Sequence, residues 1–305
     1  MSIDYPAESF APLTFVDETH TSHAPAPHFK TECWRRFKQN RIAFLGLTLL
    51  GLVLFFAIIG PVISGYTYYE TNLAMKNLPP SAQHWFGTDD LGRDVFTRVW
   101  YGARISLTVG IIAATVDLIL GVAWGSIAAF SGGTADEIMM RIADLIYGLP
   151  NLLVVILLMV VMGSGLLPII AALTIFGWIT MARIVRSQIL QIKQKEYVLA
   201  AIALGASFPR ILFKHLIPNA MGPIIITMTL TIPAAIFSEA FLSFLGLGVQ
   251  APVASWGTMA NEGLPALRYY PWRLFFPGLF ISLTIFAFNV IGDGLRDAFD
   301  PKLRK

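Results

Sequence analysis

The chain has few charged residues and a single cysteine. Asp, Glu, Lys and Arg make up 13% of its 305 residues and 55% of the residues are hydrophobic, whereas about a quarter of the residues of a soluble domain are charged. This scarcity of charge excludes an ordinary soluble domain and indicates that most of the chain lies in lipid. Cys33 has no second cysteine to pair with, which excludes a framework of intrachain disulfides.

Signatures of common catalytic sites are also missing. The dipeptide Gly-Lys does not occur, so the chain has no phosphate-binding P-loop, and neither HExxH nor GxSxG is present. His84 and His215 fall in opposite compartments under the topology given below and cannot share a metal. We therefore expect no catalytic residue, no metal site and no cofactor in this chain, and no ATP hydrolysis by the chain alone.

Long apolar runs are what the sequence has instead. Runs of about 20 apolar residues are long enough to cross the hydrocarbon core as helices. We predict an all-α membrane protein with about six transmembrane helices, at residues 42–63, 103–130, 137–162, 167–189, 220–239 and 273–291.

Basic residues orient the predicted spans. With the N-terminus inside, most of the 22 Lys and Arg residues flank the cytoplasmic ends, as the preference of Lys and Arg for cytoplasmic loops requires. Both termini are thus expected in the cytoplasm, and the positive charge requires no nucleic acid as partner. The expected parts are a flexible tail (1–30), a juxtamembrane amphipathic segment (31–41) and a six-span domain (42–305) with outer loops 64–102 and 246–272 and an inner loop 191–219.

The inner loop has helical apolar spacing on each side of a Gly-Ala-Ser break, which predicts a helix, a turn and a second helix. Gly205 suits the left-handed end of the first helix, Ser207 suits the cap of the next, and Pro209 fits a first helical turn. We expect Pro218 to mark the stop before the fifth span. Small side chains beside charged ones suit a docking surface for another protein; a hairpin that merely joins two spans is the alternative.

The spacing of this loop resembles the signature of the membrane permease subunits of bacterial ABC importers, which is Glu-Ala-Ala, three residues, Gly, nine residues, then Ile-x-Leu-Pro. The chain has Ala200-Ala201, then Gly205, then His215-Leu216-Ile217-Pro218 at the same intervals, with Leu199 in place of the acid and His215 in place of Ile. Glu196 lies near enough to substitute in part for the acid. The resemblance implies a coupling helix that docks in a cleft of an ATPase subunit. Its expected contact residues are Glu196, Tyr197, Ala200, Ala201, Gly205, Ala206, Arg210, His215 and Pro218.

Four further segments resemble the oligopeptide/dipeptide permease C-type group of these importers. They are residues 85–94 (WFGTDDLGRD), 101–107, 238–248 and 292–301. This resemblance implies a bacterial cytoplasmic-membrane machine made of this chain, a homologous second permease, two ATPase subunits that bind ATP and Mg, and an extracytoplasmic solute-binding protein. Oligopeptides are the expected cargo; the group also includes importers of dipeptides, nickel and glutathione.

Acidic residues inside predicted spans are candidates for the solute path. Asp117 falls in the middle of the second span, where an unpaired charge is costly, and either contacts solute or packs as a polar group bonded to a neighbouring span. Glu239, near the outer end of the fifth span, is the second candidate. An ion-gradient-driven secondary transporter is the rival class, although it would normally need more spans and buried ion ligands.

The acidic run that begins at Asp89 is similar to the start of a calcium loop. The acidic residue expected eleven positions later is Trp100, which weakens that interpretation. We expect instead that Thr88 or Asp89 caps the helix leading into the second span and that Arg93 pairs with an acid. Gly121 and Gly125 form a small-xxx-small pair that lets helices approach closely in lipid.

Overall fold

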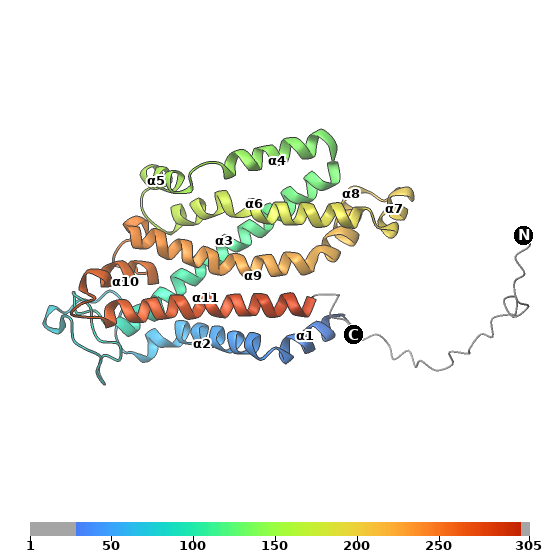
Figure 1. Cartoon of the computed structure of the whole chain (residues 1–305). Helices are drawn as coiled ribbons and strands as arrows, with labels where there is room; N and C mark the ends of the chain where they lie inside the picture. Colours follow the sequence, from blue (N-terminus) through green and yellow to red (C-terminus); the bar gives the residue numbers. More distant parts are fainter. Residues whose placement is uncertain (1–28, 300–305) are drawn as a thin grey trace, which may run out of the picture.

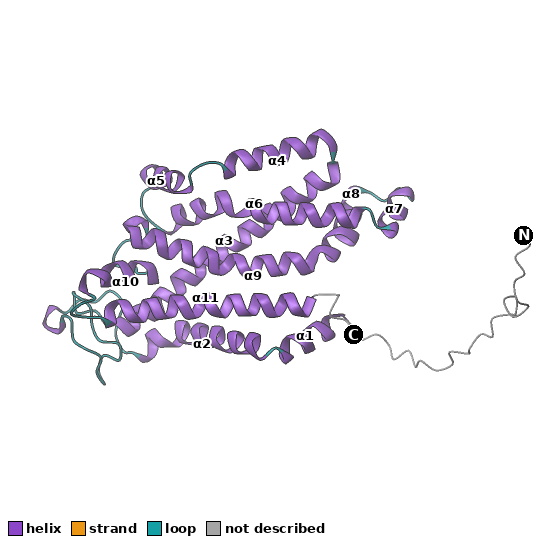
Figure 2. Cartoon of the chain, viewed as in Figure 1, coloured by secondary structure: helices purple, strands orange, loops and turns teal. Residues whose placement is uncertain are grey.

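The structure, a computed structural model, describes residues 29–299. The predicted flexible tail lies almost wholly outside the described residues. The described chain is a bundle of long helices with short helices at its two ends (Figures 1 and 2). Its elements are α1 (Phe29–Gln39), α2 (Arg41–Ile63), η2 (Leu73–Met75), α3 (Val95–Ser131), α4 (Gly133–Tyr147), α5 (Asn151–Met162), α6 (Leu166–Lys193), α7 (Glu196–Ala203), α8 (Phe208–Ile211), η3 (Leu212–Leu216), α9 (Ile217–Leu242), η4 (Ser243–Leu247), α10 (Trp256–Gly263), η5 (Leu264–Ala266) and α11 (Trp272–Phe299).

Within the described residues, the helices confirm an all-α membrane protein with five or six spans. Helices α2, α3, α6, α9 and α11 belong to runs that are long and apolar enough to cross a membrane. The pair α4 and α5 passes the same test only together and is bent by 78°. Figure 1 shows α7 and α8 protruding at one end of the bundle and α10 lying at the other, and we call these the α7 end and the α10 end.

The third predicted span, 137–162, is not a single straight helix, because the helix breaks between Tyr147 and Asn151. Pro150 stands at the first position before α5 in an extended conformation. Proline has no N–H to donate to a preceding turn, and its ring disfavours helical geometry at Leu149. Apolar residues continue on both sides of the break, densely in α5 and interspersed with charges in α4, and for this reason the run looks like one span in the sequence.

The second span begins earlier than expected, at Val95. Its cap is Asp94, whose carboxylate accepts the backbone N–H of Thr97 at 2.7 Å, so the prediction that Thr88 or Asp89 caps this helix is wrong. The Thr88 hydroxyl is occupied elsewhere, because it donates to the carbonyl of Met75 at 2.5 Å and accepts the N–H of Leu78 at 2.8 Å. It thereby ties the loop before α3 to the last residue of η2 and to Leu78 beyond it.

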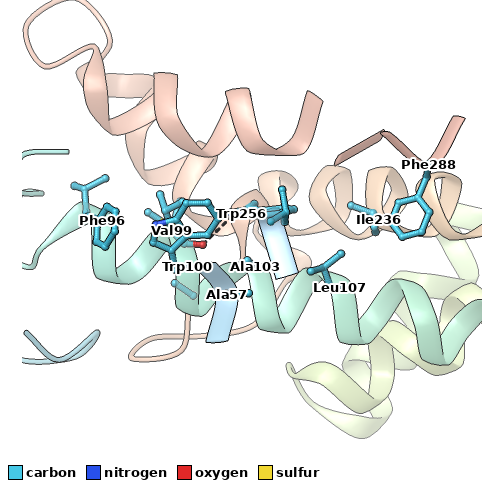
Figure 3. Packing of buried hydrophobic residues seen from close by; sticks show 13 residues of the cluster. Ala57, Phe96, Val99, Trp100, Ala103, Leu107, Ile236, Trp256 and Phe288 are labelled. Carbon is cyan, nitrogen blue, oxygen red and sulfur yellow. Dashed lines mark hydrogen bonds between the residues drawn. The ribbon is translucent and has the colours of Figure 1, made fainter. Parts of the chain in front are cut away.

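A buried apolar cluster at the α10 end joins α2, α3, α9, α10 and α11 (Figure 3). Trp256 is fully buried at its centre, and its indole N–H donates to the carbonyl of Val99 at 2.9 Å. This bond stabilises the buried indole, because an unsatisfied N–H in an apolar setting costs about 1–3 kcal/mol. Short α10 is therefore part of the bundle core and not a surface loop.

Close contact between α3 and α6 confirms that Gly121 and Gly125 are packing residues. A methyl group at Gly121 would lie 2.5 Å from Cβ of Met181, and one at Gly125 would lie 2.3 Å from the carbonyl oxygen of Ala182. Only glycine leaves the room for the two backbones to approach this far. The pair brings α3 and α6 together along the half of the bundle nearer to α7.

A network of buried charges closes the α10 end and confirms that Arg93 pairs with an acid. The Asp89 carboxylate accepts Arg93 Nε at 2.6 Å and is also bonded by Arg98. Both guanidinium groups then reach Glu262, at 3.2 Å and 3.0 Å. The carboxylates of the calcium-like run are thus engaged by protein donors, since Asp94 likewise bonds His84 Nδ1 at 2.9 Å. Glu262 joins this network from a helix more than 160 residues away, which local sequence does not reveal.

Candidate coupling and translocation sites

The predicted helix-turn-helix lies at the α7 end. Helix α7 stops at Ala203, Gly205 has a left-handed conformation with φ of +77°, and α8 begins at Phe208 with Pro209 in its first turn. Ser207 occupies the N-cap position, but its side chain makes no capping hydrogen bond, so the prediction that this hydroxyl caps the helix is wrong. The turn is held instead by backbone bonds from Gly205 N–H to Ile202 and from Ala206 N–H to Ala201.

One face of this segment is fastened to the inner ends of three long helices. Val198, Ile211 and Leu216 are buried in a cluster that also contains residues of α3, α6 and α9. Lys193, the last residue of α6, donates to the carbonyl of Phe130 in α3 at 2.7 Å. The segment is therefore a fixed part of the bundle, and its displacement would carry the ends of these helices with it.

The opposite face is exposed and partly apolar. Leu204 is 87% exposed and Phe213 is 68% exposed, and a methyl group at Gly205 would meet no atom within 4 Å. Ala200 is exposed on the same segment, and Ala201 and Ala206 are half-buried. Exposed apolar side chains of this size beside small ones are typical of a surface that another protein covers. Exposed charges surround this face: Lys195, Glu196, Arg210 and Lys214.

The remaining predicted coupling residues lie beside this face. The rings of Tyr197 and His215 are 6.3 Å apart between centroids, which brings α7 close to the helix that follows α8. Pro218 does not stop the helix, contrary to prediction. It lies in the first turn of α9, directly after the π-helical turn η3. The widened turn carries the helix through the proline, and the run from Phe208 to Leu242 is unbroken.

Asp117 and Glu239 are both enclosed by the chain's own helices. Asp117 is 3% exposed, and a methyl group at Gly177 of α6 would lie 1.9 Å from its Oδ2. Glu239 is fully buried and accepts hydroxyl bonds from Ser106 at 2.8 Å and Ser243 at 2.7 Å. The hydrogen bonds of Glu239 favour a packing role, whereas the buried Oδ1 of Asp117 has no hydrogen-bond partner among the described residues. The place of both residues on the solute path stays a prediction.

Sequence reasoning missed a charged cavity between α4 and α6 that opens widely to the surface. It has a volume of about 600 Å³ and is lined by Glu137, Met140, Arg141, Asp144, Arg183 and Arg186. Two ion pairs join the helices: Arg186 bonds both oxygens of Asp136 at 2.6 Å, and Arg183 bonds Asp144 at 2.8 Å. The signal was present in the sequence, because these charges fall inside or at the edge of predicted apolar spans.

Comparisons with known proteins agree with the arrangement of the helices. Residues 121–305 match the family model described as "binding-protein-dependent transport system inner membrane component", and residues 30–80 match "N-terminal TM domain of oligopeptide transport permease C". The chain is 64% identical to the oligopeptide transport system permease protein OppC of Bacillus subtilis, over 88% of each chain. It is 60% identical to the dipeptide transport system permease protein DppC of the same organism, over 94% of this chain and 90% of the relative.

A solved structure has the same fold in part. The MetNI methionine ABC transporter, in an inward-facing conformation, superposes with a TM-score of 0.54 at 18% identity, over 65% of this chain and 94% of that one. The family model covers more than half of the chain, and the curated relatives match nearly all of it. The chain is therefore a multi-pass inner-membrane protein that belongs to the binding-protein-dependent transport system inner membrane components of ABC transporters, in their oligopeptide/dipeptide permease C branch.

Proposed function

We propose that the chain forms half of the translocation path of an ATP-driven importer of oligopeptides or dipeptides, and that residues 191–219 dock an ATPase subunit. The exposed face of α7 and α8 carries this proposal, because it stands on a buried cluster continuous with α3, α6 and α9. Membership of a binding-protein-dependent family sets the ion-gradient-driven alternative aside. Relatives named for oligopeptides and for dipeptides support a peptide cargo.

The orientation belongs to the proposal. We place the α7 end in the cytoplasm, since α1 and the last turn of α11 lie at this end with the basic residues Arg41 and Arg296. The α10 end, with its buried ion network, then faces the solute-binding protein. ATP and Mg bind to the partner ATPase subunits, and a homologous permease supplies the other half of the path.

Close packing governs the proposed docking. Leu199 replaces the acid expected at the start of the signature, so the contact relies on the small residues Ala200 and Gly205 and on apolar Leu204. The exposed charges around them are mainly basic, since Lys195, Arg210 and Lys214 outnumber Glu196. An acidic rim on the ATPase cleft would complement this surface.

Co-purification tests the proposed subunit composition, and uptake tests which solute is transported. The chain should bring down an ATPase subunit and a second permease from mildly solubilised membranes; its recovery without an ATPase subunit would contradict the proposal. In vesicles loaded with ATP, unlabelled di- to hexapeptides should compete with uptake of a labelled peptide, and nickel or glutathione should not. Competition by nickel or glutathione alone would assign a different cargo to the same machine.

Substitution of Gly205 tests the docking surface. Gly205→Ala adds a methyl group in open space and costs about 1 kcal/mol for the left-handed conformation alone. Gly205→Arg carries the same backbone cost and adds a long charged side chain to the docking face. We expect normal insertion of both variants, uptake close to wild type for Gly205→Ala, and loss of uptake and of ATPase co-purification for Gly205→Arg. Equal uptake by the two variants would refute the docking assignment.

A further inference from the structure

Charged side chains stand exposed on α4 and α6, inside the segments 137–162 and 167–189 that the sequence predicts as spans. Asp144 has 51% of its side-chain surface exposed and Arg183 has 40%. Each charge at membrane depth costs about 2.5–3.5 kcal/mol against lipid on insertion scales. Such groups face water or a polar partner, so this side of the bundle is not a lipid-facing surface.

Helix α4 has two distinct faces. Glu137, Arg141 and Asp144 follow one another at intervals of four and three residues, which places them on one stripe of the helix. Ile138, Ile142 and Leu145, each one position further along, form an apolar stripe beside it and are exposed. The charged stripe faces α6 and borders the cavity of about 600 Å³.

Three of the five charged residues that line the cavity, Asp144, Arg183 and Arg186, take part in ion pairs. Both oxygens of Asp136 accept from Arg186, and Arg183 is held between the Asp144 carboxylate and the ring of Tyr147, 4.6 Å from its centroid. These pairs join α4 to α6 beside the cavity, and the Asp136 carboxylate is the most buried of the four groups.

The other two charged groups are available to a ligand. Glu137 and Arg141 are exposed, border the cavity, and have no ion-pair partner among the residues that the structure describes. One acid and one base, adjacent on a helix stripe, match the ammonium and carboxylate groups that every unmodified peptide carries. A site that binds these termini accepts any side-chain sequence, as a peptide importer must.

We infer that this cavity is a water-filled section of the solute path and binds the free termini of a peptide, the α-carboxylate at Arg141 and the α-ammonium at Glu137. The inference rests on the proposed function and deepens it. It assigns the path to the α4–α6 face, away from buried Asp117 and Glu239. It also disfavours a free metal cation as cargo, because three arginines border the site.

Thiol labelling tests whether the cavity contains water. In the assembled transporter with Cys33→Ser, Met140→Cys places a thiol on the cavity wall without altering a charge, and Leu145→Cys places one on the apolar stripe. A charged methanethiosulfonate reagent reacts with thiolate in water and not in lipid. We expect Met140→Cys to react about tenfold faster or more than Leu145→Cys; equal slow labelling of both would overturn the inference.

Capped peptides test which groups are bound. A dipeptide with free termini should slow labelling of Met140→Cys several-fold, whereas the N-acetylated and the C-amidated forms should be much weaker. Arg141→Gln should abolish the distinction between free and amidated peptide, and Glu137→Gln the distinction between free and acetylated peptide. Equal protection by all three peptides, or by none, would overturn terminus recognition.

Two controls separate the possible sources of failure. Uptake of labelled peptide by the Cys33→Ser parent measures the proposed function alone, so an active transporter with an unprotected thiol refutes only the site. A zwitterionic lipid headgroup carries the same two charges as a peptide. Slow labelling that persists in phosphatidylethanolamine vesicles without peptide, and becomes fast in phosphatidylglycerol vesicles, would assign the cavity to lipid and overturn the inference.

Discussion

Asp89→Asn removes the carboxylate on which two buried guanidinium groups converge. That carboxylate accepts bonds from Arg93 and Arg98 and from the backbone N–H groups of Leu91 and Arg93, at 2.9 and 3.0 Å for the last two. Asparagine keeps one oxygen but no charge, which leaves Arg93 and Arg98 with Glu262, whose side chain is 36% exposed. We expect a large loss of stability, because both arginines stay buried.

The expected cost is about 3–5 kcal/mol, the usual penalty for removing one partner of a buried ion pair. The neighbouring carboxylate is a matched control. Asp90 pairs with Arg273 at 3.0 Å but is 47% exposed, and an ion pair this open to solvent contributes about 0–1 kcal/mol. Adjacent Asp→Asn changes therefore differ mainly in the burial of the pair that each one breaks.

Thermal unfolding of the solubilised transporter, followed by size-exclusion chromatography, measures the difference. At about 2 °C for each kcal/mol, Asp89→Asn should lower the melting temperature by about 6–10 °C and Asp90→Asn by less than about 2 °C. Similar shifts for the two variants would refute the reasoning from burial.

The stability difference between wild type and Asp89→Asn should also depend on pH. Burial would raise the pKa of the Asp89 carboxyl, but the charges of Arg98 and Arg93 and the two backbone N–H groups hold it below its usual range. A carboxyl whose pKa is lower in the folded chain stabilises it above the unfolded pKa and loses this effect as pH falls through the folded pKa. The difference in melting temperature between wild type and Asp89→Asn should therefore be largest above about pH 5 and should shrink below about pH 4.

Two further predictions use the same melting assay. Gly125→Ala places a methyl group against the backbone of α6 and should cost about 1–3 kcal/mol, whereas Gly51→Ala, with no atom within 4 Å of the new group, should be neutral or stabilising. Glu239→Ala leaves the buried hydroxyls of Ser106 and Ser243 without their acceptor and should cost about 2–5 kcal/mol. Glu239→Gln keeps an acceptor and should cost clearly less. The packing described would be contradicted if Gly51→Ala cost more stability than Gly125→Ala, or Glu239→Gln more than Glu239→Ala.

Composition and periodicity predicted the long helices because membrane spans need only length and apolarity. They did not reveal the break before Pro150, since apolar residues continue on both sides of it and proline also occurs inside membrane helices. The helix-turn-helix of the coupling segment was predictable, because Gly205 and Pro209 occupy the positions that their backbone preferences dictate. The helix stop predicted at Pro218 was wrong, because the π-helical turn that accommodates this proline has no sequence signature.

Pairings between distant residues were beyond sequence reasoning. Arg93 needed an acid, but Glu262 as its second partner depends on where α10 folds back. Asp94 and not Thr88 caps α3, and the hydroxyl of Thr88 bonds instead to Met75 of η2 and to Leu78. Asp117 looked functional because an isolated charge is conspicuous in an apolar run, whereas the cavity charges were divided between two predicted spans and so were overlooked.

The unbroken helical run from Phe208 to Leu242 connects the two ends of the bundle and can move as a single lever. At 1.5 Å per residue it is about 50 Å long. A tilt of about 5° around its midpoint would displace each end by about 2 Å, in opposite directions. The hydroxyl bonds on Glu239, near the far end, are only 2.7 and 2.8 Å long. Ser243 belongs to the same helical run and moves with it, so a push on α8 of this size must either carry Ser106 of α3 along or break its bond to Glu239.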